Sequence, residues 1–198
     1  MACNFKNVLS AGNQCKENPA GLSSHMFVVP LDSEHVQSIG IHNGKNRYVI
    51  VPATEGASLK GYRIDFKSQT GQVTSESNGP GKGWAHTGTG RIDLNEDDMA
   101  YMSRMLHNTD KMLYFFPTGN VTAEGKEYKV VGNLEGDTEF STAADSGAAR
   151  GDDHGTTFTV TCSYQVYDVM KWYGTIEMSE ESSSDFVDDS TDMVEITD

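Results

Sequence analysis

The chain has 198 residues, of which 36% are hydrophobic, and 29 acidic against 15 basic side chains give it a formal net charge of −14. This length supports one domain with a proper core, and the longest apolar runs are far shorter than the ~20 residues of a membrane-spanning helix. Tight binding to nucleic acid requires clustered Lys and Arg, so the acidic balance argues against a DNA-binding protein.

The acidic side chains are concentrated at the C-terminal end. After residue 176 there are nine acids and no base, which leaves 20 acids against 15 bases for residues 1–176. The nine are Glu177, Glu180, Glu181, Asp185, Asp188, Asp189, Asp192, Glu195 and Asp198. Runs of like charge repel one another and stay solvated, so residues 177–198 are predicted to be an acidic tail. Apolar residues interrupt this tail, which also leaves open that a neighbouring subunit or a partner holds it.

The cysteines and the N-terminal residues favour a protein that folds in a cytoplasm. Cys3, Cys15 and Cys162 are an odd number at unrelated spacings, which fits neither a disulfide framework nor a CxxC zinc site. A secretory signal has a basic start followed by an apolar run, and the N-terminal residues do not show this pattern. Residues 1–23 carry Asn, Gly, Ser and Pro without periodicity and are predicted to be an arm with no core of its own.

Several strand-like segments follow this arm. Residues 24–31, 47–52 and 58–66 are rich in apolar and β-branched side chains, with alternation in the third segment. Asn43-Gly44 is a favourable turn pair between two of them. The order predicts a meander of neighbouring strands.

Residues 67–90 contain six glycines and one proline, yet strand-forming residues return from Gln72 and again from Trp84. We therefore predict a long hairpin that extends from the body as an arm, not a disordered linker. Because a two-stranded hairpin is marginally stable alone, we expect this arm to lean on a neighbour.

Residues 96–107 are predicted to form a helix. Asn95 is a suitable N-cap, and the acids of the first turn complement the helix dipole. Met99, Met102 and Leu106 recur at helical spacing, so one face is expected to pack on a sheet.

Beyond the helix the pattern returns to strands. Residues 112–116 are an apolar strand that is expected to end at Pro117, and residues 121–127 are expected to make a turn. The last predicted strand covers residues 171–178.

Residues 128–167 are the stretch around which we expect the rest to be organised: a strand, a long loop of small residues and a closing strand. The closing strand alternates an apolar face with a hydroxyl face, Phe158, Val160 and Cys162 against Thr157, Thr159 and Thr161. The loop includes Arg150, Asp152, Asp153 and His154 among glycines and alanines. It is too long for a tight hairpin and too flexible for a core, so we expect it to contact another molecule.

Many strands around one helix predict a β-rich α+β fold, a β-sandwich or half-barrel with one flanking helix and long arm-like loops. One helix cannot cover that much sheet, and free sheet edges are a hazard unless something pairs with them. We therefore expect copies of the chain to complete the sheet by closing into a ring.

The order of these segments resembles the tail tube proteins of tailed bacteriophages, in particular those of phages that infect Bacteroides-type bacteria. The resemblance covers residues 24–176 and rests on Gly-Trp-Ala-His-Thr at 83–87, the acid-started helix, the MLYFF strand, YKVVGNLEG, DSG and GTTFTVT at 155–161. The opening at residues 15–21 also looks like that of such structural proteins. The acidic tail has no counterpart in the common pattern.

The resemblance implies hexameric rings whose strands join into one barrel and whose stacking makes the pipe that conducts DNA. The protein would then be a virion component of the tail, assembled in the host cytoplasm from copies of itself and other tail or connector proteins, without enzymatic activity, cofactor or membrane segment. The arm at 67–90 would stack one ring on the next, with Gln72, Glu76, Lys82 and Trp84 as candidates. The loop residues Arg150, Asp152, Asp153 and His154 are assembly candidates, and Thr157, Thr159 and Thr161 are candidates for a lumen wall that DNA passes without specific binding.

Two functions of other classes stay open. A β-sandwich binding module, an adhesin or a carbohydrate binder, could display Trp84, Tyr101 or Trp172. A small hydrolase or a metal site could use His86 and His154, the latter with Asp152 and Asp153, although adjacent residues in a glycine-rich loop rarely converge on one ion.

Overall fold

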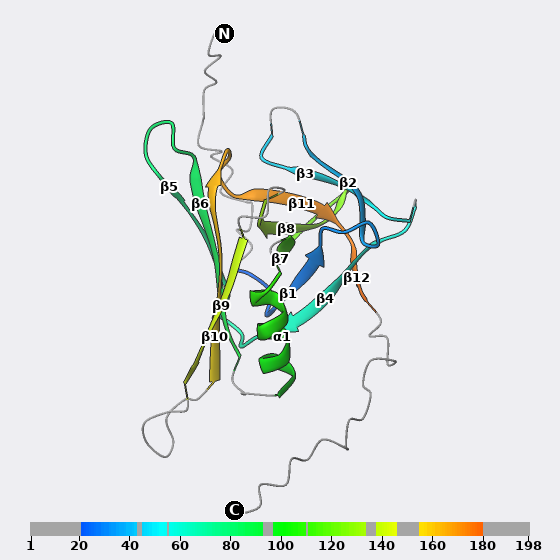
Figure 1. Ribbon diagram of the computed structural model, residues 1–198. Helices are drawn as coiled ribbons and strands as arrows, with labels where there is room; N and C mark the ends of the chain where they lie inside the picture. The colour runs from blue at the N-terminus through cyan, green and yellow to red at the C-terminus, as the bar shows by residue number, and fades with distance from the viewer. Residues whose placement is uncertain are drawn as a thin grey trace, which may run out of the picture.

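The fold, in a computed structural model, is β-rich with one helix among the described residues (Figure 1). The structure describes residues 21–42, 45–54, 56–92, 97–109, 111–133, 138–145 and 155–179. The elements are β1 (His25–Pro30), β2 (Val36–Ile41), β3 (Tyr48–Pro52), β4 (Leu59–Asp65), β5 (Gln72–Ser77), β6 (Trp84–Ile92), α1 (Asp97–His107), β7 (Met112–Thr122), β8 (Gly125–Val131), β9 (Thr138–Asp145), β10 (Gly155–Gln165), β11 (Met170–Gly174) and β12 (Ile176–Met178).

The larger sheet has six strands in the order β11-β8-β7-β1-β4-β12, and β1 is near its centre. Met26, Phe27, Val28 and Val29 are all buried, because β1 is covered on both faces and pairs with β4 on one side and β7 on the other. The predicted meander is therefore wrong. β1 pairs with β4 and β7 and not with the strand that follows it, while β2 and β3 form a separate hairpin.

The six-stranded sheet bends until its two edges approach each other. β11 and β12 are its opposite edge strands, yet Thr175 alone separates them in the chain. In a flat sheet the two edges would be about 24 Å apart, whereas the two peptide steps from Gly174 to Ile176 span at most about 7 Å. The single strand predicted for residues 171–178 is therefore two strands, divided at the bend.

An aromatic cluster fills the concave side of this sheet. Phe27, Phe115, Tyr128 and Trp172 lie with ring centroids 5.4–6.3 Å apart. The β2–β3 hairpin adds Tyr48, whose hydroxyl donates to the carbonyl of Gly132 at 2.9 Å. This cluster joins the hairpin to the sheet.

The smaller sheet has four antiparallel strands in the order β5-β6-β10-β9, seen on the left of Figure 1. The predicted hairpin of β5 and β6 is confirmed, but the idea of a poorly packed arm is wrong. β6 is an inner strand of the sheet, and a Cβ on Gly88 would lie 2.7 Å from the ring of Phe116 in the other sheet. The backbone of β6 thus packs closely on the core, and β9 was missed from the sequence.

A second core cluster lies between the two sheets and beneath α1. It includes Tyr114 and Phe116 of the six-stranded sheet together with Phe140 and Phe158 of the four-stranded sheet. The predicted helix is confirmed over Asp97–His107, and Leu106 enters this cluster with Met102 packed against it. Asn95, Glu96 and the side chain of Met99 lie outside the described part.

β7 continues past Pro117 to Thr122, so the predicted end of this strand is wrong. The register between β7 and β8 shifts between Pro117 and Val121, and such a bulge accommodates a residue that cannot donate to the ladder. The carbonyl of Pro117 accepts from the amide of Ser23 at 2.8 Å. Among the described elements, no helix combines the length and hydropathy needed to cross a membrane.

Candidate functional site

The four-stranded sheet has one core face and one open face. In β10 the predicted alternation is confirmed, because Phe158, Val160 and Cys162 are at most 1% exposed while Thr157, Thr159 and Thr161 point away from the core. The strand folds this way because only one of its two faces carries apolar side chains.

The cross-strand register extends the hydroxyl character over all four strands. Thr159 lies between Thr89 of β6 and Ser141 of β9, and Thr161 lies between Thr87 and Glu139. We call this surface the threonine face; it comprises Gln72, Thr74, Glu76, Ala85, Thr87, Thr89, Arg91, Glu139, Ser141, Ala143, Asp145, Thr157, Thr159 and Thr161. Three acids and one base give it a net charge of −2, and alanine is its largest aliphatic side chain.

Neither edge strand of this sheet has a second neighbouring strand within the described part of the chain. β5 pairs with β6 alone and β9 pairs with β10 alone, so each has an outer side that no strand of the described part pairs. α1 also reaches β9, where His107 Nδ1–H donates to the carbonyl of Phe140 at 3.2 Å and the hydroxyls of Ser103 and Thr142 lie 2.7 Å apart. Neither β5 nor β9 contains a proline or a lysine, and the charged side chains of these edge strands are the acids Glu76, Glu139 and Asp145.

The predicted arm residues divide between the sheet and its turn. Gln72 and Glu76 lie on the threonine face in β5, Lys82 is exposed in the turn that connects β5 with β6, and Trp84 is half-buried at the start of β6. Figure 1 shows this turn extending beyond the ends of β9 and β11. The loop candidates Arg150, Asp152, Asp153 and His154 lie outside the described residues.

Sequence analysis missed the contributions of β6 and β9 to this face. Residues from Trp84 onward were predicted as a strand, but the alternation of Thr87 and Thr89 with Gly88 and Gly90 was not recognised as a second hydroxyl face. Successive residues of β6 point to opposite faces. Thr87 and Thr89 form its hydroxyl face, and Gly88 and Gly90 allow its other face to pack closely on the core.

His86 lies on the core side of β6 and is fully buried. Its Nε2–H donates to the carbonyl of Tyr167 at 3.0 Å, and among the described residues Nδ1 has no hydrogen-bond partner. Burial lowers the pKa of His86 below its ordinary value, against the opposing effects of the Tyr167 carbonyl and Asp168. A neutral imidazole inside the core is not available to a substrate. His86 therefore does not suit the role that the hydrolase hypothesis gave it.

The depressed pKa of His86 predicts a pH dependence of stability. The unfolded chain has a histidine of ordinary pKa and binds the proton first, so the free energy of unfolding should fall as the pH drops from 6.5 toward the folded pKa. The slope from this group is at most about 1.4 kcal/mol per pH unit, and the contribution is constant above pH 7. Urea denaturation of the wild type and His86→Gln at pH 5–8 measures it. Parallel curves for the two proteins would contradict this assignment.

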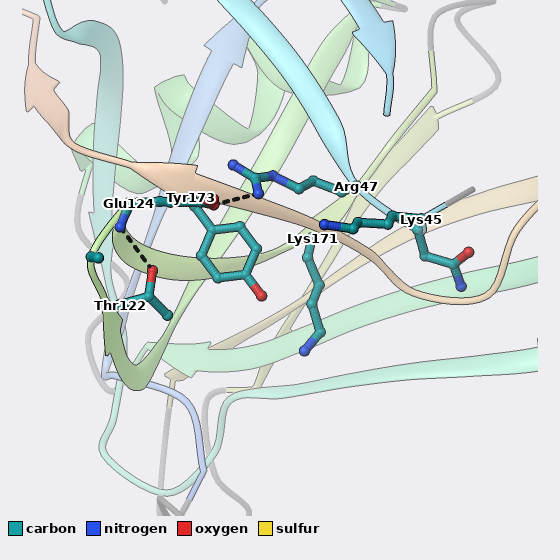
Figure 2. Close-up of a pocket in the computed structure, with 8 residues that line it drawn as sticks. Lys45, Arg47, Thr122, Glu124, Lys171 and Tyr173 are labelled. Atoms are coloured by element: carbon teal, nitrogen blue, oxygen red, sulfur yellow. Dashed lines mark hydrogen bonds and ion pairs between the residues drawn. The ribbon is translucent and has the colours of Figure 1, made fainter. Parts of the chain in front are cut away.

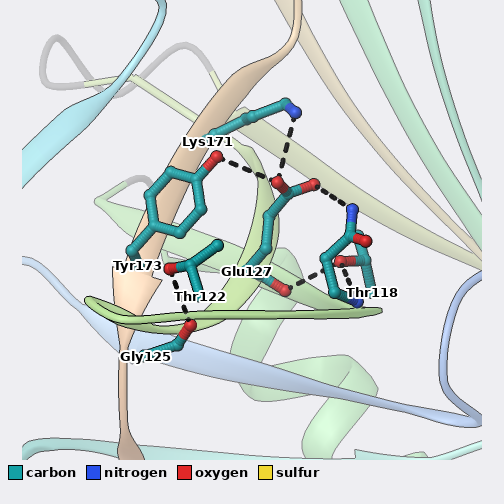
Figure 3. A network of polar contacts seen from close by, with 7 residues as sticks. Thr118, Thr122, Gly125, Glu127, Lys171 and Tyr173 are labelled. Carbon is teal, nitrogen blue, oxygen red and sulfur yellow. Dashed lines mark hydrogen bonds and ion pairs between the residues drawn. The ribbon is translucent and has the colours of Figure 1, made fainter. Parts of the chain in front are cut away.

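A carboxylate network lies at the outer face of β8 and β11 (Figure 3). Glu127 is buried and accepts hydrogen bonds from the Tyr173 hydroxyl at 2.9 Å, Lys171 Nζ at 3.3 Å and Asn120 Nδ2 at 3.4 Å. Burial alone would raise the pKa of Glu127, but the Tyr173 hydroxyl and Lys171 favour the charged form and hold the pKa below its usual value. The network fixes Lys171 and Tyr173 in place.

The binding-module hypothesis loses one of its three aromatic residues. Trp172 is 7% exposed inside the aromatic cluster and cannot be displayed to a glycan. Trp84 is half-buried, and the Tyr101 side chain lies outside the described part. Of the described His, Cys, Asp and Glu side chains, no three lie close enough together to hold a metal ion.

Comparisons with known proteins add no relative. No protein-family model, no curated protein and no solved structure matches this chain.

Proposed function

We propose that this chain is a structural subunit of a bacteriophage tail tube, in which copies form stacked hexameric rings and the threonine face lines the bore. The observation that carries the proposal is one sheet with a packed core face, an open hydroxyl face and two edge strands that pair on one side only. A monomer uses the core face but leaves the hydroxyl face and the two edges without a partner. A ring in which β5 of one copy follows β9 of the next uses each of them.

Joining the sheets explains the edges and the finer architecture. Each subunit is then a β-sandwich or half-barrel with α1 at its flank, and the four-stranded sheets become one intersubunit barrel. Closure of a sheet into a barrel pairs every backbone group and removes the edges that favour aggregation.

The threonine face has the chemistry that a DNA conduit needs. Double-stranded DNA carries one negative charge per ~1.7 Å of its axis, so clustered bases on the wall would hold it. The wall instead offers hydroxyl groups and a net charge of −2 per subunit, with Arg91 as its one base. At physiological ionic strength the repulsion from such a wall reaches about 8 Å, enough to keep the phosphates off the surface.

The same proposal gives roles to the segments outside the sheet. The turn that carries Lys82 would contact the next ring, and the loop with Arg150, Asp152, Asp153 and His154 would join neighbouring copies. At the tube ends these surfaces would meet other tail or connector proteins. The chain is thereby placed in the virion, without catalytic role or cofactor, and DNA passes it without specific binding.

Light scattering and negative-stain microscopy of the purified full-length chain test this proposal. We expect particles of several copies, and rings or tubes with a central hole at raised protein concentration. A 21.6 kDa monomer at every concentration would overturn the proposal. Retention of such a monomer on a glycan column would favour the binding module.

A further inference from the structure

An open pocket of about 510 Å³ lies where the start of β3 meets the β7–β8 turn and β11 (Figure 2). Its lining includes Lys45, Arg47, Glu124, Lys171 and Tyr173. The isolated bridge between Arg47 and Lys171 connects β3 with β11 at this point. The pocket is therefore built from three parts of the fold that the core holds together.

The pocket is basic on an acidic protein. Its lining has three bases and one acid, whereas the whole chain carries −14. Arg47 is held by an ion pair with Glu124 and by the ring of Tyr173, 4.6 Å from the guanidinium carbon, and its Nε is buried without an acceptor among the described residues. Lys171 keeps two N–H donors after its contact with Glu127, and Lys45 is exposed. These donors are arranged for carboxylates.

An apolar strip continues from this pocket along β3. Val49 and Val51 share the outward face of the strand with Arg47, because Tyr48 is buried on the opposite face. Val49 is 46% exposed and Val51 37% exposed, which is uncommon for valines in the middle of a strand. A ligand for this surface should combine acids with apolar side chains.

We propose that the pocket and the strip bind the acidic C-terminal segment, residues 180–198, of a second copy of this chain. The segment has eight acids and no base, and Phe186, Val187, Met193, Val194 and Ile196 lie among the acids. Its charge and its apolar residues complement the two parts of the surface.

The direction of β12 indicates why the segment comes from a neighbour. The chain leaves the pocket at Tyr173, and β12 then runs parallel to β4 from Leu59 to Gly61, away from the pocket of its own copy. Nineteen further residues can extend over roughly 65 Å, which is enough to reach an adjacent molecule. The inference requires that copies meet, but it does not require that they form a tube.

Carbodiimide cross-linking of the full-length chain tests this inference, because the reagent joins amines to carboxylates that are in contact. We expect links from Lys45 or Lys171 to acids of residues 180–198, and in a mixture of ¹⁴N and ¹⁵N protein they should join light chains to heavy ones. Lys111 is exposed outside the pocket and serves as a control that should remain unlinked. Because no Lys or Arg follows Lys171, trypsin leaves the acidic segment in a single C-terminal peptide. Mass spectrometry of the digest then identifies which lysines are linked to this peptide and at which acids.

Two peptides separate charge recognition from random contact. A synthetic peptide of residues 180–198 should abolish the links to the pocket when added in excess, whereas the same peptide with all eight acids as amides should leave them intact. Raising the salt to 1 M, where the Debye length falls to about 3 Å, should also suppress them.

The inference is overturned if the links of Lys45 and Lys171 occur within single chains only, if they reach only acids of residues 21–179, if Lys111 links equally often, or if none form. If rings form without these links, the docking of the C-terminal segment is wrong and the tube proposal still stands. If the links form between chains but rings do not, the tube proposal is wrong and the docking of the C-terminal segment still stands.

Discussion

Gly90→Ala is expected to lower the free energy of unfolding by about 1–3 kcal/mol, whereas Gly40→Ala should change it by less than about 0.5 kcal/mol. Both glycines lie in strands, and the same methyl group is added at each. At Gly90 the new Cβ would lie 2.5 Å from Cζ and 2.7 Å from Cε1 of Phe158, with Phe66 Cγ at 3.2 Å. At Gly40 nothing lies within 4 Å.

The clash at Gly90 has no easy relief. Phe158 is its cross-strand partner and is fully buried between the two sheets, in ring contact with Phe66 and Phe140. Moving the ring would disturb the whole cluster, because interiors are close-packed. Urea denaturation measures the difference, and each kcal/mol lost corresponds to about 2–4 °C in Tm for a chain of this size. Equal effects of the two substitutions would show that β6 does not pack closely on the core.

Local patterns predicted the elements whose two faces differ in chemistry. The alternation of β10 and the helical spacing of Met102 and Leu106 each mark a face that is buried and a face that is not. β9 was missed because it buries only Thr138 and Phe140, and its last residues are small and exposed. A strand with so few apolar residues gives almost no period.

Long-range pairing could not be obtained from local patterns. The central place of β1 depends on its pairing with β4 and β7, and the bend between β11 and β12 depends on the curvature of the whole sheet. The same limit applies to the threonine face. The hydroxyl residues of β10 were evident, whereas Thr87, Thr89 and Ser141 joined them only through the cross-strand register.

The outer edge of β9 offers the sharpest test of whether sheets join between copies. Ala143 and Ala144 are adjacent, exposed residues of this edge strand, and their amides point to opposite sides because successive residues of a strand alternate in direction. Proline removes the amide hydrogen. One of Ala143→Pro and Ala144→Pro therefore loses a hydrogen bond to β10, and the other loses only its outward donor.

We expect the inward variant to lower Tm and the outward variant to keep nearly the wild-type Tm but to lose assembly into rings. Thermal unfolding first identifies which variant is which, so each serves as the control for the other. Light scattering and negative-stain microscopy then measure the assembly of the variant that stays folded. The substitution removes one outward donor of β9 and places a proline ring where the next β5 would approach, so it should block the pairing of the two strands. Normal rings from this variant would show that copies meet through another surface and would remove the continuous barrel from the proposal.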